Sequence, residues 1–327
     1  MIKFKVNPLP QHNFYDSEIE LVDRIFYKQQ QKKVGFYRRM FDEDFSRLFH
    51  HSNNRSSNLF NISSNDDEFM KTLFGNIHNR RTTHQIDEII LELVTDIAQS
   101  LIWYGKAYYL LQQDVDTNKI HTISFSSQGV ISFFGKYIQW VPRRRKRHND
   151  QLLPREIRVL DSKKVMRFDM PIPIKHMLSE QNRTLAVLDQ HQYSEIKFLT
   201  QAQGDSPSSI NYFNFSEWND IQELALYRAT KDTGWNCRKY DSSKRSDFFD
   251  CHRLIRFRRN QLTLRDQILN QLSNELSRVG KVYNPKFSIN ISSSDELPSI
   301  AFLNELEVRL EREDVSFDDI IDYCNRR

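Results

Sequence analysis

The residues whose types and spacing could do chemistry centre on a Glu-x-Lys pair, Glu195 and Lys197. In metal-dependent nucleases, two carboxylates hold Mg²⁺ while a lysine orients the attacking water. Asp169 or Asp189 could supply the second carboxylate, and a short strand predicted over 195–199 would carry the pair. The pattern therefore predicts one alternative function, a Mg²⁺-dependent nuclease, although Glu-x-Lys is a short pattern that also arises by chance.

Other catalytic and ligand-binding motifs are missing from the sequence. The three cysteines, Cys237, Cys251 and Cys324, show no Cys-x-x-Cys spacing, and the ten histidines show no His-x-x-x-His spacing, so no metal site is predicted. The eight glycines include no Gly-x-Gly, which excludes a dinucleotide fingerprint, and residues 129–136 are one residue too long for a phosphate-binding loop. We therefore expect no cofactor and favour a protein without enzymatic activity.

Charge is unevenly distributed along the chain, although the formal net charge is only +4. Residues 141–170 hold ten Lys/Arg against four Asp/Glu, and residues 228–286 hold fourteen against six. Residues 295–322 reverse the balance, with two basic residues against ten acidic ones. A basic middle followed by an acidic tail is typical of a chain that contacts a polyanion or an acidic partner, and ordinary solvated faces are the simpler interpretation.

Two basic segments are candidates for contact with phosphates, because each neutralised phosphate releases counterions and adds affinity that does not depend on base sequence. The first is a predicted loop and the second is a face of a predicted helix. The candidate nucleic-acid-binding residues are Arg143, Arg144, Arg145, Lys146, Arg147, Arg253, Arg256, Arg258 and Arg259.

The predicted helix over 248–279 leaves two interpretations open. Arg258 and Arg265 project into its apolar side, where an arginine must reach solvent, pair with a carboxylate or meet a partner. The segment Arg253–Arg259 could follow a phosphate backbone. It could equally bind the acidic residues 295–322, within one chain or between chains.

Apolar periodicity predicts a long buried helix that positions the middle of the chain. From Ile86 to Leu111 apolar residues recur at steps of three and four, and Thr82 with Gln85 offers a capping box before them. Further helices are predicted over 16–50, 218–230, 248–279, 300–312 and 317–323.

A small antiparallel β unit is predicted after this helix, because β-branched and aromatic residues alternate with polar turns. Its strands are expected over 119–125, 130–141, 157–160 and 165–168. Residues 174–210 are ambiguous, with short strands predicted over 185–188 and 195–199. The Ser/Asn-rich residues 50–67 predict a loop or linker.

The predicted fold class is α+β, predominantly helical with a small antiparallel β unit in the middle of the chain. Residues 1–82 form a helical N-terminal region with a polar linker, residues 83–210 the long helix and β unit, and residues 211–327 a helical C-terminal region with the acidic tail. The sparse cysteines and the absence of a signal-peptide pattern predict a cytoplasmic protein. The most apolar stretch, 101–111, is far shorter than the roughly 20 residues of a membrane helix, so no membrane contact is expected.

The order of motifs over residues 85–171 resembles the wing region of tailed-phage portal proteins. A long helix ends in a Gly-x-Ala-Tyr turn, Gly105–Tyr108, and leads into the β unit, where Leu153–Glu156 gives a Leu-Pro-x-Glu step. The resemblance implies a ring oligomer around DNA with no catalytic residues and no cofactor. Residues 248–279 would then form a stem or wing helix, and the protein could also reside in a virion.

Taken together, the residues and the resemblance predict a non-enzymatic assembly protein, portal-like or derived from a portal. It would contact nucleic acid, DNA in preference to RNA, and form a homo-oligomer or larger assembly. The first alternative is the Mg²⁺-dependent nuclease, as part of a phage-defence system or mobile element. The second is a protein-binding scaffold subunit, whose acidic tail and basic helix would mate with other chains.

Overall fold

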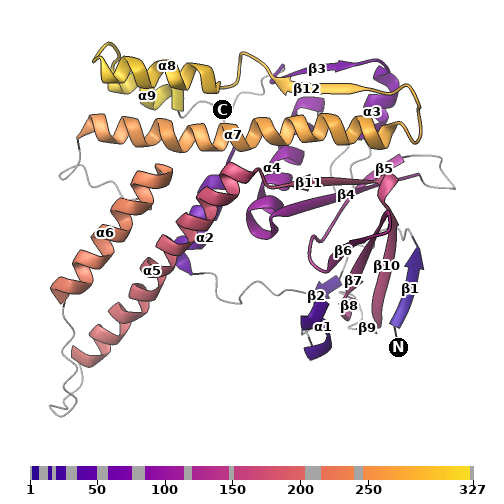
Figure 1. Ribbon diagram of the computed structural model, residues 1–327, viewed down its shortest axis with the longest axis horizontal. Coiled ribbons are helices and arrows are strands. Elements are labelled where there is room, and N and C mark those ends of the chain that lie inside the picture. The colour runs from indigo at the N-terminus through magenta and orange to yellow at the C-terminus, as the bar shows by residue number, and fades with distance from the viewer. Residues whose placement is uncertain are drawn as a thin grey trace. The chain divides into compact units, whose positions relative to one another are not determined.

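A computed structural model describes the chain over residues 2–6, 14–16, 20–26, 35–49, 58–75, 85–113, 120–146, 151–202, 215–238 and 246–324 (Figure 1). Over these residues the fold is mixed α+β and mostly helical with small antiparallel sheets, which confirms the predicted fold class. None of the described helices combines the length and the apolar character that crossing a membrane would require.

The helices are α1 (Leu21–Phe26), α2 (Phe36–Ser46), α3 (Asp67–Gly75), α4 (Ile86–Tyr104), α5 (Ile172–Ala202), α6 (Phe215–Thr233), α7 (Asp247–Gly280), α8 (Ile300–Glu311) and α9 (Phe317–Cys324). The strands are β1 (Ile2–Val6), β2 (Phe14–Asp16), β3 (Phe60–Ser64), β4 (Lys106–Gln113), β5 (Ile120–Phe125), β6 (Val130–Phe133), β7 (Lys136–Val141), β8 (Arg144–Lys146), β9 (Leu152–Leu153), β10 (Arg155–Asp161), β11 (Val165–Asp169) and β12 (Ile289–Ser293), with a 3₁₀ turn η1 (Ser162–Lys164).

The chain forms two compact units, each assembled from separate segments. Unit 1 comprises Met1–Lys32, Arg55–Met170 and Asp266–Glu296, and unit 2 comprises Lys33–Asn54, Pro171–Arg265 and Leu297–Arg327. Helix α7 supplies its N-terminal part to unit 2 and its C-terminal part to unit 1. The predicted division into the consecutive segments 1–82, 83–210 and 211–327 stays a prediction.

Two of the four described sheets of unit 1 form one apolar cluster through their facing side chains. The four-stranded sheet has the order β1-β10-β7-β6, and the three-stranded sheet has the order β11-β4-β5. Tyr108 and Leu110 of β4 pack with Leu160 of β10 and Val165 of β11, and the partly buried Tyr137 of β7 joins them. The predicted strands over 119–125, 130–141, 157–160 and 165–168 are all present, with the second divided into β6 and β7 by a turn.

Helix α4 ends earlier than its apolar period predicts. Gly105 caps it with φ +73°, and its N–H donates to the Leu101 carbonyl at 2.7 Å. Residues 106–113 then form β4, so the predicted continuation of the helix to Leu111 is wrong. Glycine tolerates the left-handed conformation that ends a helix, and the resemblance to portal proteins, which implied a turn here, gives the correct boundary.

Unit 2 is helical over its described residues, and its core lies between α7, α8 and α9. Cys251, Ile255 and Leu262 of α7 pack against Leu303 of α8 and Ile320 of α9, all of them buried. Helices α5 and α6 lie against each other, and α2 packs on α5 (Figure 1). The strands predicted over 185–188 and 195–199 are wrong, because both segments belong to the 31-residue helix α5.

The N-terminal predictions are right for some residues and wrong for others. The region 16–50 contains α1 and α2, as expected, but Asp16 ends strand β2. The predicted loop over 50–67 contains β3, which pairs antiparallel with β12. Ile62 lies opposite Ile291 at the centre of this pairing. The capping residue Thr82 lies outside the described residues.

Candidate nucleic-acid interface

The first basic segment is a strand rather than an open loop. Residues 144–146 form β8, which pairs antiparallel with β2 on one side and with β9 on the other. Arg143 lies 3.3 Å from a Glu20 oxygen, and Arg144 lies 3.1 Å from Glu156 Oε2. Both guanidinium groups therefore already have a carboxylate partner within unit 1.

Glu156 gathers three cations at the centre of this region. Lys5 Nζ lies 2.8 Å from Oε1, while Arg144 and Arg158 each approach Oε2 to 3.1 Å. Burial alone would raise the pKa of Glu156, but the hydrogen bond from Lys5 and the charges of Arg158 and Arg144 outweigh it and lower the pKa below its ordinary value. The carboxylate is thus ionised and neutralises a local excess of positive charge.

Arg145 is the described member of this segment that faces solvent. Its side chain is exposed, whereas the Arg144 side chain is largely buried against Glu156. The side chain of Lys146 and all of Arg147 lie outside the described residues. Arg143 and Arg145 are therefore the described members that could exchange solvent for a phosphate.

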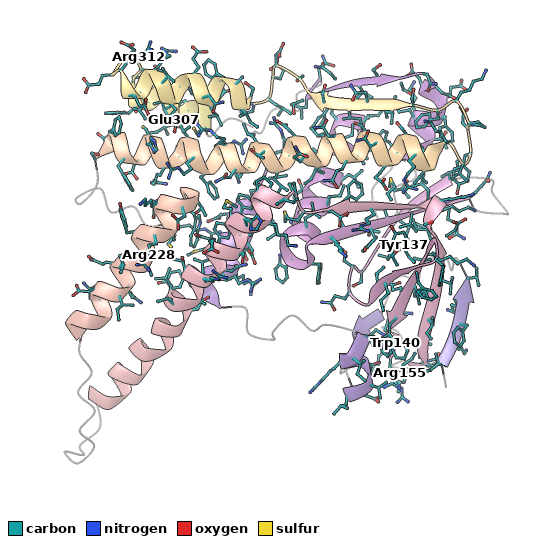
Figure 2. The ribbon with its side chains drawn as sticks, viewed as in Figure 1. Tyr137, Trp140, Arg155, Arg228, Glu307 and Arg312 are labelled. Carbon is teal, nitrogen blue, oxygen red and sulfur yellow. The ribbon has the colours of Figure 1, made fainter. Side chains whose placement is uncertain are left out.

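The basic residues of α7 also have partners within the chain. Arg253 Nε lies 2.5 Å from Asp250 Oδ1, and Arg256 donates to the Lys231 carbonyl. Arg259 donates to Glu307 of α8, whose other carboxylate oxygen lies 3.3 Å from His252 Nε2 (Figure 2 labels Glu307). Within the chain, Arg259 thus contacts the acidic segment, whereas Arg253 and Arg256 contact other groups.

Arg258 is too deeply buried to be one of the predicted nucleic-acid-binding residues. Only 1% of the residue is exposed, and Nη1 donates to the Leu48 carbonyl at 2.9 Å and to Gln261 Oε1 at 3.1 Å. Burial, with a smaller contribution from the charge of Arg265, lowers the pKa of Arg258 to about 10. Because the guanidinium group is enclosed, it serves the core of unit 2 and offers no surface to a phosphate.

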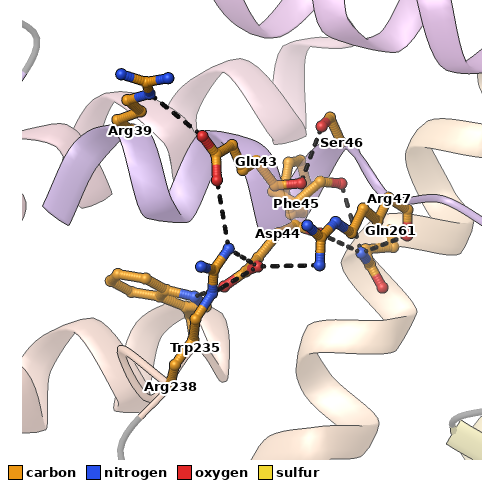
Figure 3. A network of polar contacts seen from close by, with 9 residues as sticks. All are labelled: Arg39, Glu43, Asp44, Phe45, Ser46, Arg47, Trp235, Arg238 and Gln261. Carbon is orange, nitrogen blue, oxygen red and sulfur yellow. Dashed lines mark hydrogen bonds and ion pairs between the residues drawn. The ribbon is translucent and has the colours of Figure 1, made fainter. Parts of the chain in front are cut away.

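Gln261 and Asp44 hold α2 and α7 together beside these arginines (Figure 3). Gln261 Nε2 donates to the carbonyls of Asp44 (3.0 Å) and Arg47 (2.9 Å) at the C-terminal end of α2, where the Asp44 carbonyl also accepts from the Arg47 N–H at 3.3 Å. The Asp44 carboxylate accepts from the indole N–H of Trp235 at 2.9 Å and from both Nε and Nη2 of Arg238. This network fixes residues 234–238, the turn that directly follows α6.

A pocket of about 1020 Å³ lies beside the same turn in unit 2. Its charged lining is largely paired, since Arg238 meets Asp44 and Arg253 meets Asp250. Across the part of the chain that the structure describes, no cluster of three or more His, Cys, Asp or Glu side chains could hold a metal ion.

Of the four nuclease candidates, the structure describes the side chains of Asp169, in unit 1, and Asp189, in unit 2. Asp169 pairs with Arg167 at 2.8 Å, and Asp189 accepts from the Tyr37 N–H at 2.8 Å, where it caps α2. Glu195 and Lys197 lie on α5, and their side chains are outside the described residues. The predicted strand over 195–199, which would have placed both residues on one face, is replaced by helix.

The sequence-based prediction missed a group of cations in unit 1, next to the C-terminal end of α7. Arg278 donates to the carbonyl of Ser162 at 3.1 Å and to that of Val165 at 2.6 Å, which fixes η1 beside the helix. Turn η1 presents Lys163 and Lys164 at this position. The adjacent lysines in a turn were the signal that could have been used.

Two more lysines adjoin this turn. Lys136 opposes Asp161, the residue before η1, in the β10–β7 ladder, and Lys281 follows α7 directly. Lys164 Nζ lies 5.9 Å from the ring centre of Tyr283. We define the lysine cluster by its four members, Lys136, Lys163, Lys164 and Lys281.

Comparison with known proteins gives structural matches alone. No family model and no curated protein matches the chain. It is similar to the neck of a native gene transfer agent particle (11% identity, TM-score 0.41, covering 90% of this chain and 91% of that chain) and to the virion of such a particle (12%, 0.38, 82% and 85%). It is also similar to an HK97-family phage portal protein from Corynebacterium diphtheriae (8%, 0.34, 77% and 92%).

These matches include a portal protein, the family that residues 85–171 resemble in sequence. With identities of 12% or less and TM-scores below 0.5, the likeness concerns the fold and says nothing of partners or stoichiometry.

Proposed function

We propose that the chain is a portal-like subunit of a homo-oligomeric assembly that works without enzymatic activity. The observation that supports this is the course of the chain from α4 to α5. Helix α4 ends at Gly105, β4 carries Ala107 and Tyr108, and the Leu-Pro-x-Glu step of Leu153–Glu156 leads into β10. Strand β11 then passes through Pro171 into α5, in the order that the portal resemblance implies.

The mass of the purified chain in solution tests the oligomeric part of this proposal. Multi-angle light scattering at low micromolar concentration should give a mass several times that of the 39.2 kDa chain, at low and at moderate salt. A mass of one chain under all of these conditions would refute the proposal.

We propose further that the assembly contacts DNA through Arg143, Arg145 and the lysine cluster. Exposed ion pairs such as that of Arg143 contribute little, about 0–1 kcal/mol, so a phosphate can replace the carboxylate. Lys136, Lys163 and Lys281 of the lysine cluster are exposed and Lys164 is half-buried, and the contacts of Arg278 fix the backbone of η1, which carries two of the four. A subunit of this kind would act in the cytoplasm or within a virion.

Binding of double-stranded DNA across a salt series tests this interaction. The affinity should fall steeply with salt, and Lys163→Ala with Lys281→Ala should make the slope shallower by about one for each phosphate that the variant no longer neutralises. Lys71→Ala with Lys175→Ala removes two exposed lysines elsewhere and should leave the slope unchanged. Equal slopes for both double variants would contradict the assignment of the cluster.

The same samples test the nuclease alternative. With Mg²⁺ present, we expect DNA to stay intact, because Glu195 and Lys197 belong to helix α5 and not to the strand that the nuclease alternative assumed. Mg²⁺-dependent cleavage that Glu195→Ala abolishes would restore the alternative.

A further inference from the structure

The first strand of unit 1, β1, has its apolar side chains on the outer face of the sheet. In a sheet with one solvated face, apolar side chains usually face the core. Residues 2–6 alternate as Ile2-Lys3-Phe4-Lys5-Val6. Lys5 points toward the inner layer, where its ammonium group meets the buried Glu156 at 2.8 Å. Because successive side chains alternate, the apolar residues of β1 must face outward. Phe4 is 73% exposed and Val6 is 76% exposed.

The strand register continues this apolar outer face across the whole four-stranded sheet. Phe4 opposes Ile157, which opposes Trp140. Residues directly opposite each other lie on the same face. A second row runs across all four strands, and its members are Val6, Val159, Ile138 and Ile131.

Helix α1 enlarges this surface. Phe26 stacks on Trp140 with ring centres 4.7 Å apart, and Asp23 accepts from the Trp140 indole N–H at 3.0 Å, so α1 lies on the outer face (Figure 2 labels Trp140). Leu21 and Ile25 point away from this contact and are 77% and 73% exposed. The helix thus covers part of the apolar face and adds further apolar surface of its own.

The turn between β6 and β7 adds two aromatic rings at the edge. Phe133 and Phe134 contact each other edge to face at 4.5 Å, and Phe134 is 88% exposed. Phe134 has φ +43°, a conformation that costs a bulky residue about 1 kcal/mol or more. Gly135 follows with φ +70°, and a two-residue hairpin of type I′ requires positive φ at both positions, so the turn itself holds the Phe134 ring at the edge of the sheet.

The exposed apolar area of this face indicates the size of the partner surface that it could bind. With about 150–250 Å² for each aromatic side chain, the exposed parts of Phe4, Phe133 and Phe134 amount to roughly 400 Å². The exposed aliphatic side chains add a comparable area, so the total is on the order of 800 Å², the share of one partner in a stable protein interface. The largest apolar patch of a typical monomer measures about 300–600 Å².

We infer that this outer face of the β1-β10-β7-β6 sheet, together with α1, is the surface through which the chain binds a second copy of itself. The inference rests on the proposed function, because a homo-oligomer supplies another copy to every subunit. Arg155 holds Asp23 at 2.8 Å at one end of the face and provides the polar rim that surrounds such apolar contacts. The lysines of β1 lie on the opposite face and stay clear of the interface.

The test is the mass of full-length variants by multi-angle light scattering. Phe4→Glu with Val6→Glu, and separately Leu21→Glu with Ile25→Glu, should weaken assembly by about 30-fold or more in the dissociation constant. Lys3→Gln changes the same strand on its other face and should assemble like the wild type. These outer side chains are exposed, so circular dichroism and melting temperature should show folded variants.

Each outcome separates this inference from the proposed function. Wild type that assembles while both glutamate variants dissociate supports the inference. Assembly of all variants alike overturns the inference and leaves the portal-like proposal standing. A wild-type chain that stays single at every concentration overturns both.

A cross-linking experiment identifies what covers the face. With p-benzoylphenylalanine in place of Phe4, illumination of a mixture of long-tagged and untagged chains should give a product that contains both forms. A product confined to single chains would overturn the inference, as would cross-links to added lipid vesicles that replace those between chains.

Discussion

At the residue scale, a buried carboxyl group in α2 should make stability depend on pH. Asp42 is 5% exposed, and burial raises its pKa from 3.8 to about 7, although Arg38 at 3.8 Å offsets part of the effect. The folded chain therefore binds one more proton than the unfolded chain between about pH 4 and pH 7. The free energy of unfolding should fall as pH rises through this interval and stay low above it.

Asp42→Asn should remove this pH-dependent destabilisation. We expect the variant to be more stable than the wild type at pH 8 by about 1–3 kcal/mol, and no more stable below pH 4. Urea unfolding at several pH values measures the difference, and Glu43→Gln, at an exposed position of the same helix, serves as the control. If the free energy of unfolding changed with pH in the same way for the wild type and for Asp42→Asn, the argument would be contradicted.

Asp189 offers a second prediction at this scale, because its structural role differs from the catalytic one considered from the sequence. Its carboxylate lies so close to Gly35 that an added Cβ would come within 1.8 Å of Oδ2, and it accepts from the Tyr37 N–H. Asp189→Ala should destabilise the chain by about 1 kcal/mol, and Asp189→Asn by less, as for other helix caps. Abolished Mg²⁺-dependent cleavage at unchanged stability would instead support the nuclease.

At the element scale, two glycines that end helices should respond differently to the same substitution. Gly105 and Gly234 have φ values of +73° and +83°. An added Cβ at Gly105 would meet nothing within 4 Å, whereas at Gly234 it would come within 2.1 Å of the Arg253 carbonyl oxygen. Helix α6 therefore approaches α7 as closely as glycine permits.

Gly105→Ala should cost about 1 kcal/mol, which is the strain of the left-handed conformation alone. Gly234→Ala should cost at least twice as much, because the backbone of α7 must also move. Guanidinium unfolding of the two variants gives the comparison. Equal destabilisation would show that the packing of α6 on α7 is looser than the structure has it.

The same elements show which helices and strands could be predicted from local sequence patterns. The helices over 218–230, 248–279, 300–312 and 317–323 were predictable, because each buries one stripe at a helical period. Strand β4 was mistaken for helix because Ala107–Leu111 are all buried, which removes the alternation of a half-buried strand. In α5 an irregular apolar pattern gave false strands, although packing on α2 and α6 maintains the helix.

At the scale of the whole molecule, the candidate site was the least predictable part. The arginines were found from their spacing, but their partners come from distant positions: Glu20 meets Arg143, and Glu307 meets Arg259. A local pattern holds no information on such pairs. The pairing of β3 with β12, whose partners Ile62 and Ile291 are far apart in the chain, was out of reach for the same reason.

The acidic segment illustrates the consequence for function. Its alternatives in the sequence were docking within a chain or between chains, and α8 packs on α7 of the same chain through Leu303 and Leu306. The surface that we infer for contact with other copies is instead the apolar outer face of unit 1, whose alternation Ile2-Lys3-Phe4-Lys5-Val6 is visible in the sequence. The sequence alone could not show which side of that strand faces outward.

Electron microscopy of the purified full-length chain tests the central claim, a portal-like homo-oligomer, most directly. The account predicts closed rings of identical subunits with an axial opening, present at low micromolar concentration without DNA. Particles of single chains, or open filaments without closure, would contradict it.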